Sequence, residues 1–299
     1  MLVCGVDENG LGPRLGPLVA TAATIEVKAY DAPQLQRLGA SAGVGDSKQH
    51  SAFGRMAKAE SLTLALTENA LGRPAKDADD LFEALTLEGR LGLRAPCPGG
   101  QTEQQCWSAP LALPAFGGDP EVGRAMLDTL KSGGVKVRRI RTTLACASRI
   151  NTALARGDSK LQVDLSLFED LLLDARSAER RNLLALCGMV GGIRKYENYF
   201  RRLTPSGKGT GQTAYKVPKL GEVRFEVKAD DRHLPVGLAS MVGKVVRELA
   251  MRRIVLFYQG HNGKLRDVSG YHDPVTKEFV EKTAKLRRRL KIQSDCFER

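Results

Sequence analysis

Residues 3–13 read VCGVDENGLGP, an apolar run that leads directly into the adjacent acids Asp7 and Glu8 and then into a glycine-rich turn. The run predicts a short buried strand over residues 2–6. Side chains alternate across a strand, so the two acids can reach one site only where the strand ends or twists. Gly10 and Gly12 supply that break. In isolation the pair would be interpreted as a turn cap and a solvated acid.

A second pair of acids ends another predicted strand. The alternating stretch EVRFEVKA at 222–229 leads into Asp230 and Asp231. Carboxylates clustered at strand ends suit hard cations such as Mg²⁺, which prefer oxygen ligands. Two such ions about 4 Å apart can activate a water and stabilise a leaving oxygen in phosphoryl transfer. In a basic protein, this pattern indicates chemistry on nucleic-acid phosphodiesters.

The composition narrows the class of protein. The 299 residues are 42% hydrophobic, enough for a sizeable core, and 46 Lys and Arg against 34 Asp and Glu give a net charge of +12. Such a balance favours a polyanionic partner, nucleic acid before an anionic membrane. The six cysteines form no C-x-x-C pair, and we expect free thiols in a reducing cytoplasm. No apolar run approaches a membrane span and no secretory signal opens the chain, so we expect no membrane association.

The order of the elements predicts a mixed α/β sheet. Predicted strands lie at 2–6, 18–27, 135–144, 182–190 and 222–229, and predicted helices at 51–71, 77–93, 164–176, 235–258 and 274–291. Five prolines and two Gly-Gly pairs mark residues 93–120 as a surface excursion, and residues 204–218 are predicted to be a loop. We expect a first domain over 1–245 and a basic helical part over 246–299.

Four blocks in order resemble the type 2 ribonucleases H. They are GVDENGLGPRLGPLVATA at 5–22, GDSK at 45–48, KADDRHLPVGLASMVGK at 228–244 and SGYHDP at 269–274. Each block is weak to moderate alone, and the four in family order are specific. The resemblance implies a ribonuclease-H-like α/β fold with a C-terminal helical part. It also implies Mg²⁺- or Mn²⁺-dependent hydrolysis of RNA paired to DNA, or of single ribonucleotides within a DNA duplex. We expect the protein to be a monomer.

The resemblance also assigns roles to individual residues. The catalytic, metal-binding acids would be Asp7, Glu8 and Asp230. Asp231 has no counterpart in the family, and its plain interpretation is a helix cap. Substrate contacts would come from Gly10, Leu11, Gly12, Ser47, Lys48, Lys244 and Tyr271. Small residues such as Ser240 and Gly243 are expected to let a helix pack close to the sheet.

Two positions depart from the family pattern. The third acid of the D-E-D-D ligand set falls at Gly188, where Asp231 or Glu197 are the acids that could move in. The arginine of the family's G-R-G loop is Leu11, which removes a guanidinium from phosphate contact. The chain is therefore either an enzyme with fewer protein ligands or a degenerate relative that binds nucleic acid without cutting it. The third hypothesis is an unrelated basic α/β protein.

Positive charge gathers near the C-terminus. Residues 244–291 carry 13 Lys or Arg against 5 acids, a net +8. This predicts a basic helical surface for a nucleic-acid duplex, with Arg287, Arg288 and Arg289 as phosphate contacts. Arg14, within the first block, is a further candidate.

Overall fold

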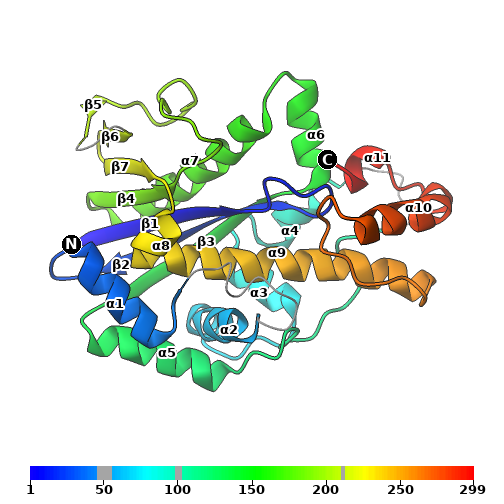
Figure 1. Ribbon diagram of the computed structural model, residues 1–299, viewed down its shortest axis with the longest axis horizontal. Coiled ribbons are helices and arrows are strands. Elements are labelled where there is room, and N and C mark those ends of the chain that lie inside the picture. The colour runs from blue at the N-terminus through cyan, green and yellow to red at the C-terminus, as the bar shows by residue number, and fades with distance from the viewer. Residues whose placement is uncertain (46–55, 98–102, 210–212) are drawn as a thin grey trace.

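A seven-stranded mixed sheet forms the centre of the computed structural model, which describes residues 1–45, 56–97, 103–209 and 213–299 (Figure 1). The strand order is β3-β2-β1-β4-β7-β6-β5. Central β1 pairs antiparallel with β2 and parallel with β4, and β4 is parallel to β7. The strands are β1 (Leu2–Asn9), β2 (Leu18–Glu26), β3 (Lys136–Ala145), β4 (Leu183–Gly188), β5 (Gly207–Lys208), β6 (Ala214–Val217) and β7 (Gly221–Glu226).

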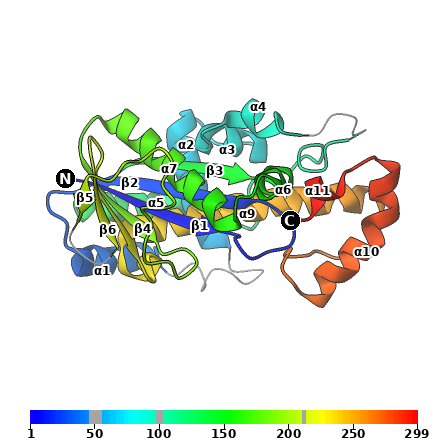
Figure 2. The ribbon, with the colours of Figure 1, turned by 90° about the horizontal axis from the view of Figure 1, so that it is seen from above.

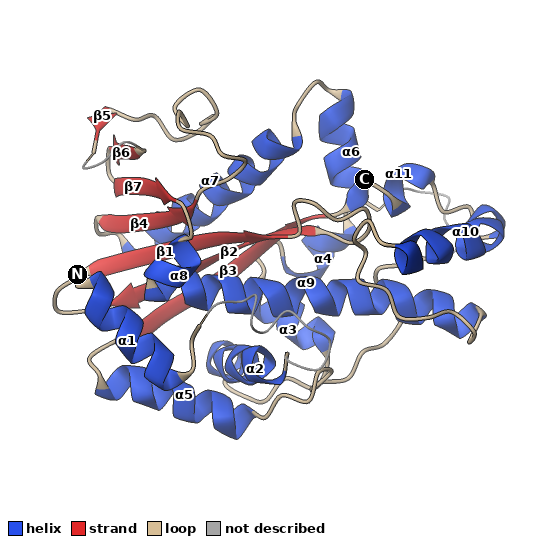
Figure 3. Ribbon diagram, in the orientation of Figure 1, coloured by secondary structure: helices blue, strands red, loops and turns tan. Residues whose placement is uncertain are grey.

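Helices cover both faces of this sheet (Figure 3). In Figure 1, α7 lies above it, and α1, α2, α5 and α9 lie below. The predicted α/β fold with a helical C-terminal part is thus confirmed. The helices are α1 (Ala32–Ala42), α2 (Ala57–Leu71), α3 (Ala78–Leu85), α4 (Gly89–Arg94), α5 (Pro120–Ser132), α6 (Ala147–Ala155), α7 (Lys160–Glu179), α8 (Ala229–Arg232), α9 (Leu234–His261), α10 (Pro274–Arg289) and α11 (Ser294–Phe297).

The alternation of β1 divides the core into two layers. Val3 belongs to the apolar cluster on the α9 side, whereas Cys4 and Val6 belong to the cluster on the α7 side. Continuing this alternation directs Asp7 toward α9 and Glu8 toward α7. The strand end therefore offers one carboxylate to each helix layer.

Helix α9 lies unusually close to the sheet because glycines face it. A Cβ at Gly5 would fall 2.2 Å from the backbone carbon of Pro235, so only glycine fits there. A Cβ at Gly243 would come within 2.7 Å of Asn9 Nδ2 and of Thr21 Oγ1. This contact supports the packing role expected for Gly243 and brings this part of α9 against the end of β1.

Local signals explain where several helices begin. Asp31 accepts from the backbone N–H of Gln34 at the start of α1, and Asp273 does the same for Thr276 at α10. Ser159 and Gln162 form a reciprocal capping box at α7. Each arrangement satisfies N–H groups that have no partner within the helix.

The C-terminal helices form a separate lobe against the second half of α9. Figure 2 shows α10 and α11 at the opposite end of the molecule from β5 and β6. Their apolar side chains, including Phe279 and Phe297, pack on Tyr258 of α9. Because α9 runs from Leu234 to His261, the predicted boundary at residue 245 falls inside one continuous helix. The division into 1–245 and 246–299 stays a prediction.

Two element predictions were wrong. The helix expected over 77–93 is divided into α3 and α4, because Thr86 adopts extended backbone and forms a bridge with Thr142 of β3. Gly89 then has a φ of 61°, which suits glycine at a reversal. The loop expected over 204–218 contains the hairpin strands β5 and β6, with residues 210–212 outside the described part.

The excursion at 93–120 is tied to the body by a buried acid. Glu60 on α2 accepts hydrogen bonds from the backbone N–H groups of Ala115, Phe116 and Gly118. These bonds satisfy the carboxylate and anchor the end of the excursion. Within the described ranges, no helix has both the length and the apolar character that crossing a bilayer requires.

Candidate functional site

The acids predicted to act together lie at one edge of the sheet. β1, β4 and β7 are parallel, so their carboxyl ends face the same way. Asp7 and Glu8 are at the end of β1, Gly188 is the last residue of β4, and Asp230 follows β7 in the short helix α8. This edge of the sheet is the candidate site.

Asp7 is held in surroundings that favour its protonated form. Burial and the neighbouring charge of Glu8 raise its pKa well above the ordinary range, and Asp230 adds to the effect. A hydrogen bond with the Ser240 side chain on α9 acts in the opposite direction. Mutual repulsion of this kind is typical of carboxylates gathered for a cation or for proton transfer.

The pKa of Glu8, whose side chain lies on the other face of β1, is shifted by neighbouring acids as well. Burial raises its pKa from the ordinary 4.5 to about 8, with further contributions from the charges of Asp164 and Asp230. A divalent cation would reverse this balance, because it favours the ionised carboxylates.

This pKa predicts how the metal-free protein responds to pH. Folded Glu8 keeps a proton that the unfolded chain releases near pH 4.5, so the folded state binds more protons between pH 4.5 and about 8. The contribution of Glu8 to the free energy of unfolding should therefore fall as pH rises through this window. Melting temperatures of chelator-treated protein test this, and Glu8→Gln should flatten the slope. An equal slope in the variant would remove Glu8 as the cause.

Gly188 leaves the end of β4 without a carboxylate. A Cβ built there would lie 2.8 Å from Asp7 Oδ1 and 3.5 Å from Glu8 Oε2. The carboxylate of Asp7 therefore leans over the position where the family's third acid would begin. The acids suggested as replacements stay outside this arrangement: Glu197 accepts a hydrogen bond from Tyr215 (2.6 Å), and no contact of Asp231 with the site is seen among the described residues.

The sequence reasoning missed one acid of this cluster. Asp164, on the first turns of α7, is completely buried, and its charge raises the pKa of Glu8. Its own pKa is raised well above the ordinary range by burial and by Asp7. The signal was present, because Asp164 lies one turn before the core residue Phe168 on the apolar face of a predicted helix.

The acids are not arranged as a preformed metal centre. Within the described ranges, no three His, Cys, Asp or Glu side chains already have the geometry of a metal site. Carboxylates without a cation repel one another. The orphaned oxygens of Asp164, whose charge acts together with those of Asp7 and Glu8, nevertheless add to an all-oxygen donor set of the type that Mg²⁺ and Mn²⁺ accept. The donor chemistry fits a divalent cation.

The glycine-rich turn after β1 is supported from the C-terminal end of the chain. Gly10 has a φ of 92°, and a Cβ there would lie 2.8 Å from Arg247 Nε. Arg299 donates to the carbonyl oxygen of Gly10. Gly12 has open space around its Cα, whereas Leu11 packs on the α7-side core. Two guanidinium groups, those of Arg247 and Arg299, thus lie against the turn that carries Leu11.

The block around Tyr271 approaches the same turn. The backbone N–H groups of Arg14 and Leu15 donate to the carbonyl oxygen of Gly270, at 2.8 and 3.0 Å. The exposed ring of Tyr271 lies over the buried guanidinium of Arg247, 5.0 Å from carbon to ring centre. The first and last sequence blocks are therefore neighbours in space, as their assignment to one substrate site requires.

The remaining predicted contacts have other partners or lie elsewhere. Lys244 is paired with Glu248 at 3.2 Å, and Arg14 with Glu298 at 2.6 Å. Ser47 and Lys48 lie outside the described residues.

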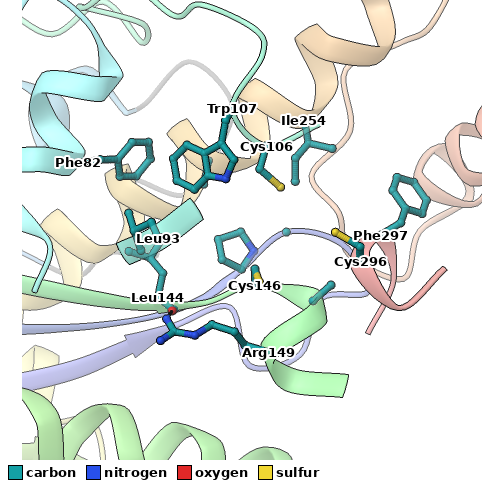
Figure 4. Close-up of a pocket in the computed structure, with 14 residues that line it drawn as sticks. Phe82, Leu93, Cys106, Trp107, Leu144, Cys146, Arg149, Ile254, Cys296 and Phe297 are labelled. Atoms are coloured by element: carbon teal, nitrogen blue, oxygen red, sulfur yellow. Dashed lines mark hydrogen bonds between the residues drawn. The ribbon is translucent and has the colours of Figure 1, made fainter. Parts of the chain in front are cut away.

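A separate apolar cavity of about 40 Å³ lies between the excursion, α6 and α11 (Figure 4). Cys106, Cys146 and Cys296 line it together with Trp107 and Phe297. Burial raises the pKa of the Cys106 and Cys146 thiols, which keeps them neutral and unreactive. None of the clustered acids lines this cavity, and its surroundings indicate a packing role between the excursion and the C-terminal lobe.

Comparison with known proteins agrees with the sequence blocks. No protein-family model matches the chain. A ribonuclease HII from Methanothermobacter thermautotrophicus is 47% identical over 62 residues, a stretch that spans 20% of this chain and 28% of that protein.

Solved structures extend the likeness along the whole chain. The ribonuclease HII in a PCNA complex from Archaeoglobus fulgidus superposes with a TM-score of 0.50 at 17% identity, covering 99% of this chain and 93% of that one. A Bst ribonuclease HIII solved with Mn²⁺ gives 0.49 at 15% identity, covering 100% and 66%. The predicted resemblance is confirmed at the level of the fold: this chain has the fold of ribonuclease HII, and a stretch of 62 residues is similar in sequence to a ribonuclease HII.

Proposed function

We propose that this protein is a divalent-metal-dependent endoribonuclease. Its substrate would be RNA paired to DNA, either as a hybrid strand or as single ribonucleotides in a DNA duplex. The observation that carries the proposal is the interacting set of Asp7, Glu8 and Asp230 at the carboxyl edge of a ribonuclease-H-type sheet.

The residues of the site would have different roles in this reaction, set by where each one lies. Asp7, Glu8 and Asp230 would hold Mg²⁺ or Mn²⁺, which when bound supplies an activated water and stabilises the leaving oxygen. Ser240 orients the Asp7 carboxylate through its hydrogen bond. The backbone around Gly10 and Gly12 can approach a ribose closely, because neither position has a side chain.

The duplex would lie between the glycine-rich turn and the C-terminal lobe. Tyr271 is exposed beside this turn and can stack on a sugar or base. The excess positive charge of residues 244–291 gives the lobe the polarity that phosphate binding requires. The six free cysteines agree with a reducing compartment, which supports a cytoplasmic location. A monomeric state stays a prediction.

The second candidate is a protein that binds such duplexes without cutting them. Gly188 and Leu11, at two positions of one site, favour it. A substrate panel separates the two functions: an RNA–DNA hybrid, a DNA duplex with one ribonucleotide and an all-DNA duplex, each with Mg²⁺ and with Mn²⁺. An enzyme cuts the first or second and spares the third. A binding protein shifts all three in a mobility assay and leaves them intact.

The salt dependence of duplex affinity tests whether the basic C-terminal lobe binds the phosphates. Arg288 and Arg289 are exposed, so replacing both with alanine should weaken binding to every duplex sequence alike. For about six phosphate contacts, wild-type affinity should fall on the order of 10³-fold between about 50 and 200 mM salt. The double variant should show a shallower slope. A slope identical to that of the wild type would exclude these side chains from the interface.

Arg287 is expected to behave differently from its two neighbours. Its guanidinium donates to Thr283 Oγ1 at 2.7 Å and stacks 3.9 Å from the centre of the Phe297 ring. The prediction that Arg287, Arg288 and Arg289 make equivalent phosphate contacts therefore does not fit the surroundings of Arg287. Arg287→Ala should lower the melting temperature and serves as the structural comparison for the other two.

A further inference from the structure

Asp164 is the buried acid whose position the fold does not explain. It lies on α7, is fully inaccessible to solvent, and neither carboxylate oxygen has a hydrogen-bond partner. Buried polar groups in native proteins are almost always satisfied, and each exception needs a physical reason.

Two other buried acids show how this fold satisfies such a group. Glu60 accepts three backbone N–H groups from the end of the excursion. Glu169, on the same helix as Asp164, accepts three with its Oε1 from Arg201, Arg202 and Leu203, although its Oε2 has no hydrogen-bond partner. Both carboxylates therefore hold segments of chain in place. Asp164 holds nothing comparable, so a structural role does not account for it.

The surroundings of Asp164 indicate a different partner. Its charge acts on Asp7 and Glu8, and Glu8 projects toward the α7 side of β1. A leucine would suit the apolar face of α7 and remove the cost of burying an acid. An acid with free oxygens beside two further acids is stabilised by protonation or by a cation, and only a cation can be held by the carboxylates together.

We propose that Asp164 is a further protein ligand of the divalent-cation site, supplying from helix α7 the carboxylate that strand β4 lacks at Gly188. The inference rests on the proposed metal-dependent function. It explains how the site keeps four acids although one strand has lost its own. The donor set is then Asp7 and Glu8 from β1, Asp164 from α7 and Asp230 from α8.

Gly188 fits this arrangement. Asp7 Oδ1 lies 2.8 Å from where a Cβ of residue 188 would stand, so Asp7 already occupies the space above β4. A fourth carboxylate can then enter from the opposite layer of the sheet, where α7 packs on β1 and β2. The loss on β4 and the acid on α7 are two parts of one rearrangement.

The test is the affinity for Mn²⁺ alone, measured by calorimetry without substrate, for wild type and Asp164→Asn. The isosteric amide removes the anionic ligand and keeps the volume. The affinity should fall by about 10-fold or more. Without metal, Asp164→Asn should melt at a temperature equal to or above that of the wild type, because an unsatisfied acid is gone, and the stabilisation by added Mn²⁺ should shrink. Asp164→Leu gives the same readout if the amide variant misfolds.

Two controls separate the possible outcomes. Glu169→Gln, a buried acid on the same helix, should destabilise the fold and leave Mn²⁺ affinity within about twofold. Asp7→Asn should abolish tight binding. If Asp7→Asn loses Mn²⁺ and Asp164→Asn keeps wild-type affinity, Asp164 is not a ligand and the proposed function stands. If the wild-type protein binds no Mn²⁺ at all, the proposed function itself fails.

Discussion

Replacing Asp7 with asparagine is expected to abolish metal-dependent cleavage, by on the order of 10³-fold or more, the scale seen when a charge-stabilising group is lost at a transition state. Asp7 is the acid on which the other charges converge: Glu8, Asp230 and Asp164 all interact with it. Single-turnover cleavage of a duplex with one ribonucleotide measures the loss. Duplex affinity without metal should be retained, because no phosphate contact is removed.

Asp231→Asn is the matched control for this loss. Asp231 is the carboxylate next to Asp230 in α8, and it does not contribute to the pKa shifts of Asp7 or Glu8. Cleavage by this variant should stay within a few-fold of the wild type. Equal losses in both variants would indicate a general charge effect, and full activity of Asp7→Asn would eliminate the assigned site.

Gly188→Asp is expected to raise metal affinity and cleavage together, and most of all in the Asp164→Asn background. The new side chain begins 3.5 Å from Glu8 Oε2, so its carboxylate can reach the same cation. Asp7 has to rotate, which is feasible because its carboxylate is the end of a flexible side chain. In Asp164→Asn, recovery of about tenfold in Mn²⁺ affinity is expected. The gain should be larger with Mg²⁺, which demands stricter octahedral geometry.

Gly188→Ala isolates the steric part of this change. It introduces the same Cβ, 2.8 Å from Asp7 Oδ1, without a carboxylate. We expect weaker metal binding than in the wild type. If Gly188→Asp and Gly188→Ala are equally impaired in both backgrounds, position 188 is too close to Asp7 to carry a ligand. If Gly188→Asp strongly raises metal affinity in the wild-type background and Asp164→Asn leaves that affinity unchanged, the missing ligand belongs at position 188 and not on α7.

The sequence was sufficient for the strand-end acids because their signal is local. An apolar run, two acids and a glycine turn predicted β1, although the strand extends to Asn9 and not only to residue 6, and the acid pair after β7 predicted the position of Asp230. The alternation of residues in β1 could also have assigned Asp7 and Glu8 to opposite layers. What it could not provide was the identity of the helix that faces Glu8.

The place of Asp164 in the site could not be predicted from the sequence, because it depends on long-range packing. Its spacing to Phe168 indicates a buried face, but only the crossing of α7 over β1 brings it to Glu8. The same limit applies to Arg247 and Arg299, which reach Gly10 from residues more than 200 positions away. The prediction of a helix over 77–93 was wrong for a related reason, because the bridge between Thr86 and Thr142 overrides the local helical preference.

The measurement that tests the central claim most directly is hydrolysis of a DNA duplex carrying one ribonucleotide. The wild-type protein is assayed with Mn²⁺, with Mg²⁺ and with a chelator, beside an all-DNA duplex of the same sequence. We predict a single cut at the ribonucleotide that requires the divalent cation and is absent from the all-DNA duplex. Salt-sensitive binding with no cut of this duplex, nor of an RNA–DNA hybrid, under either cation would contradict the account and leave a binding protein on a ribonuclease H fold.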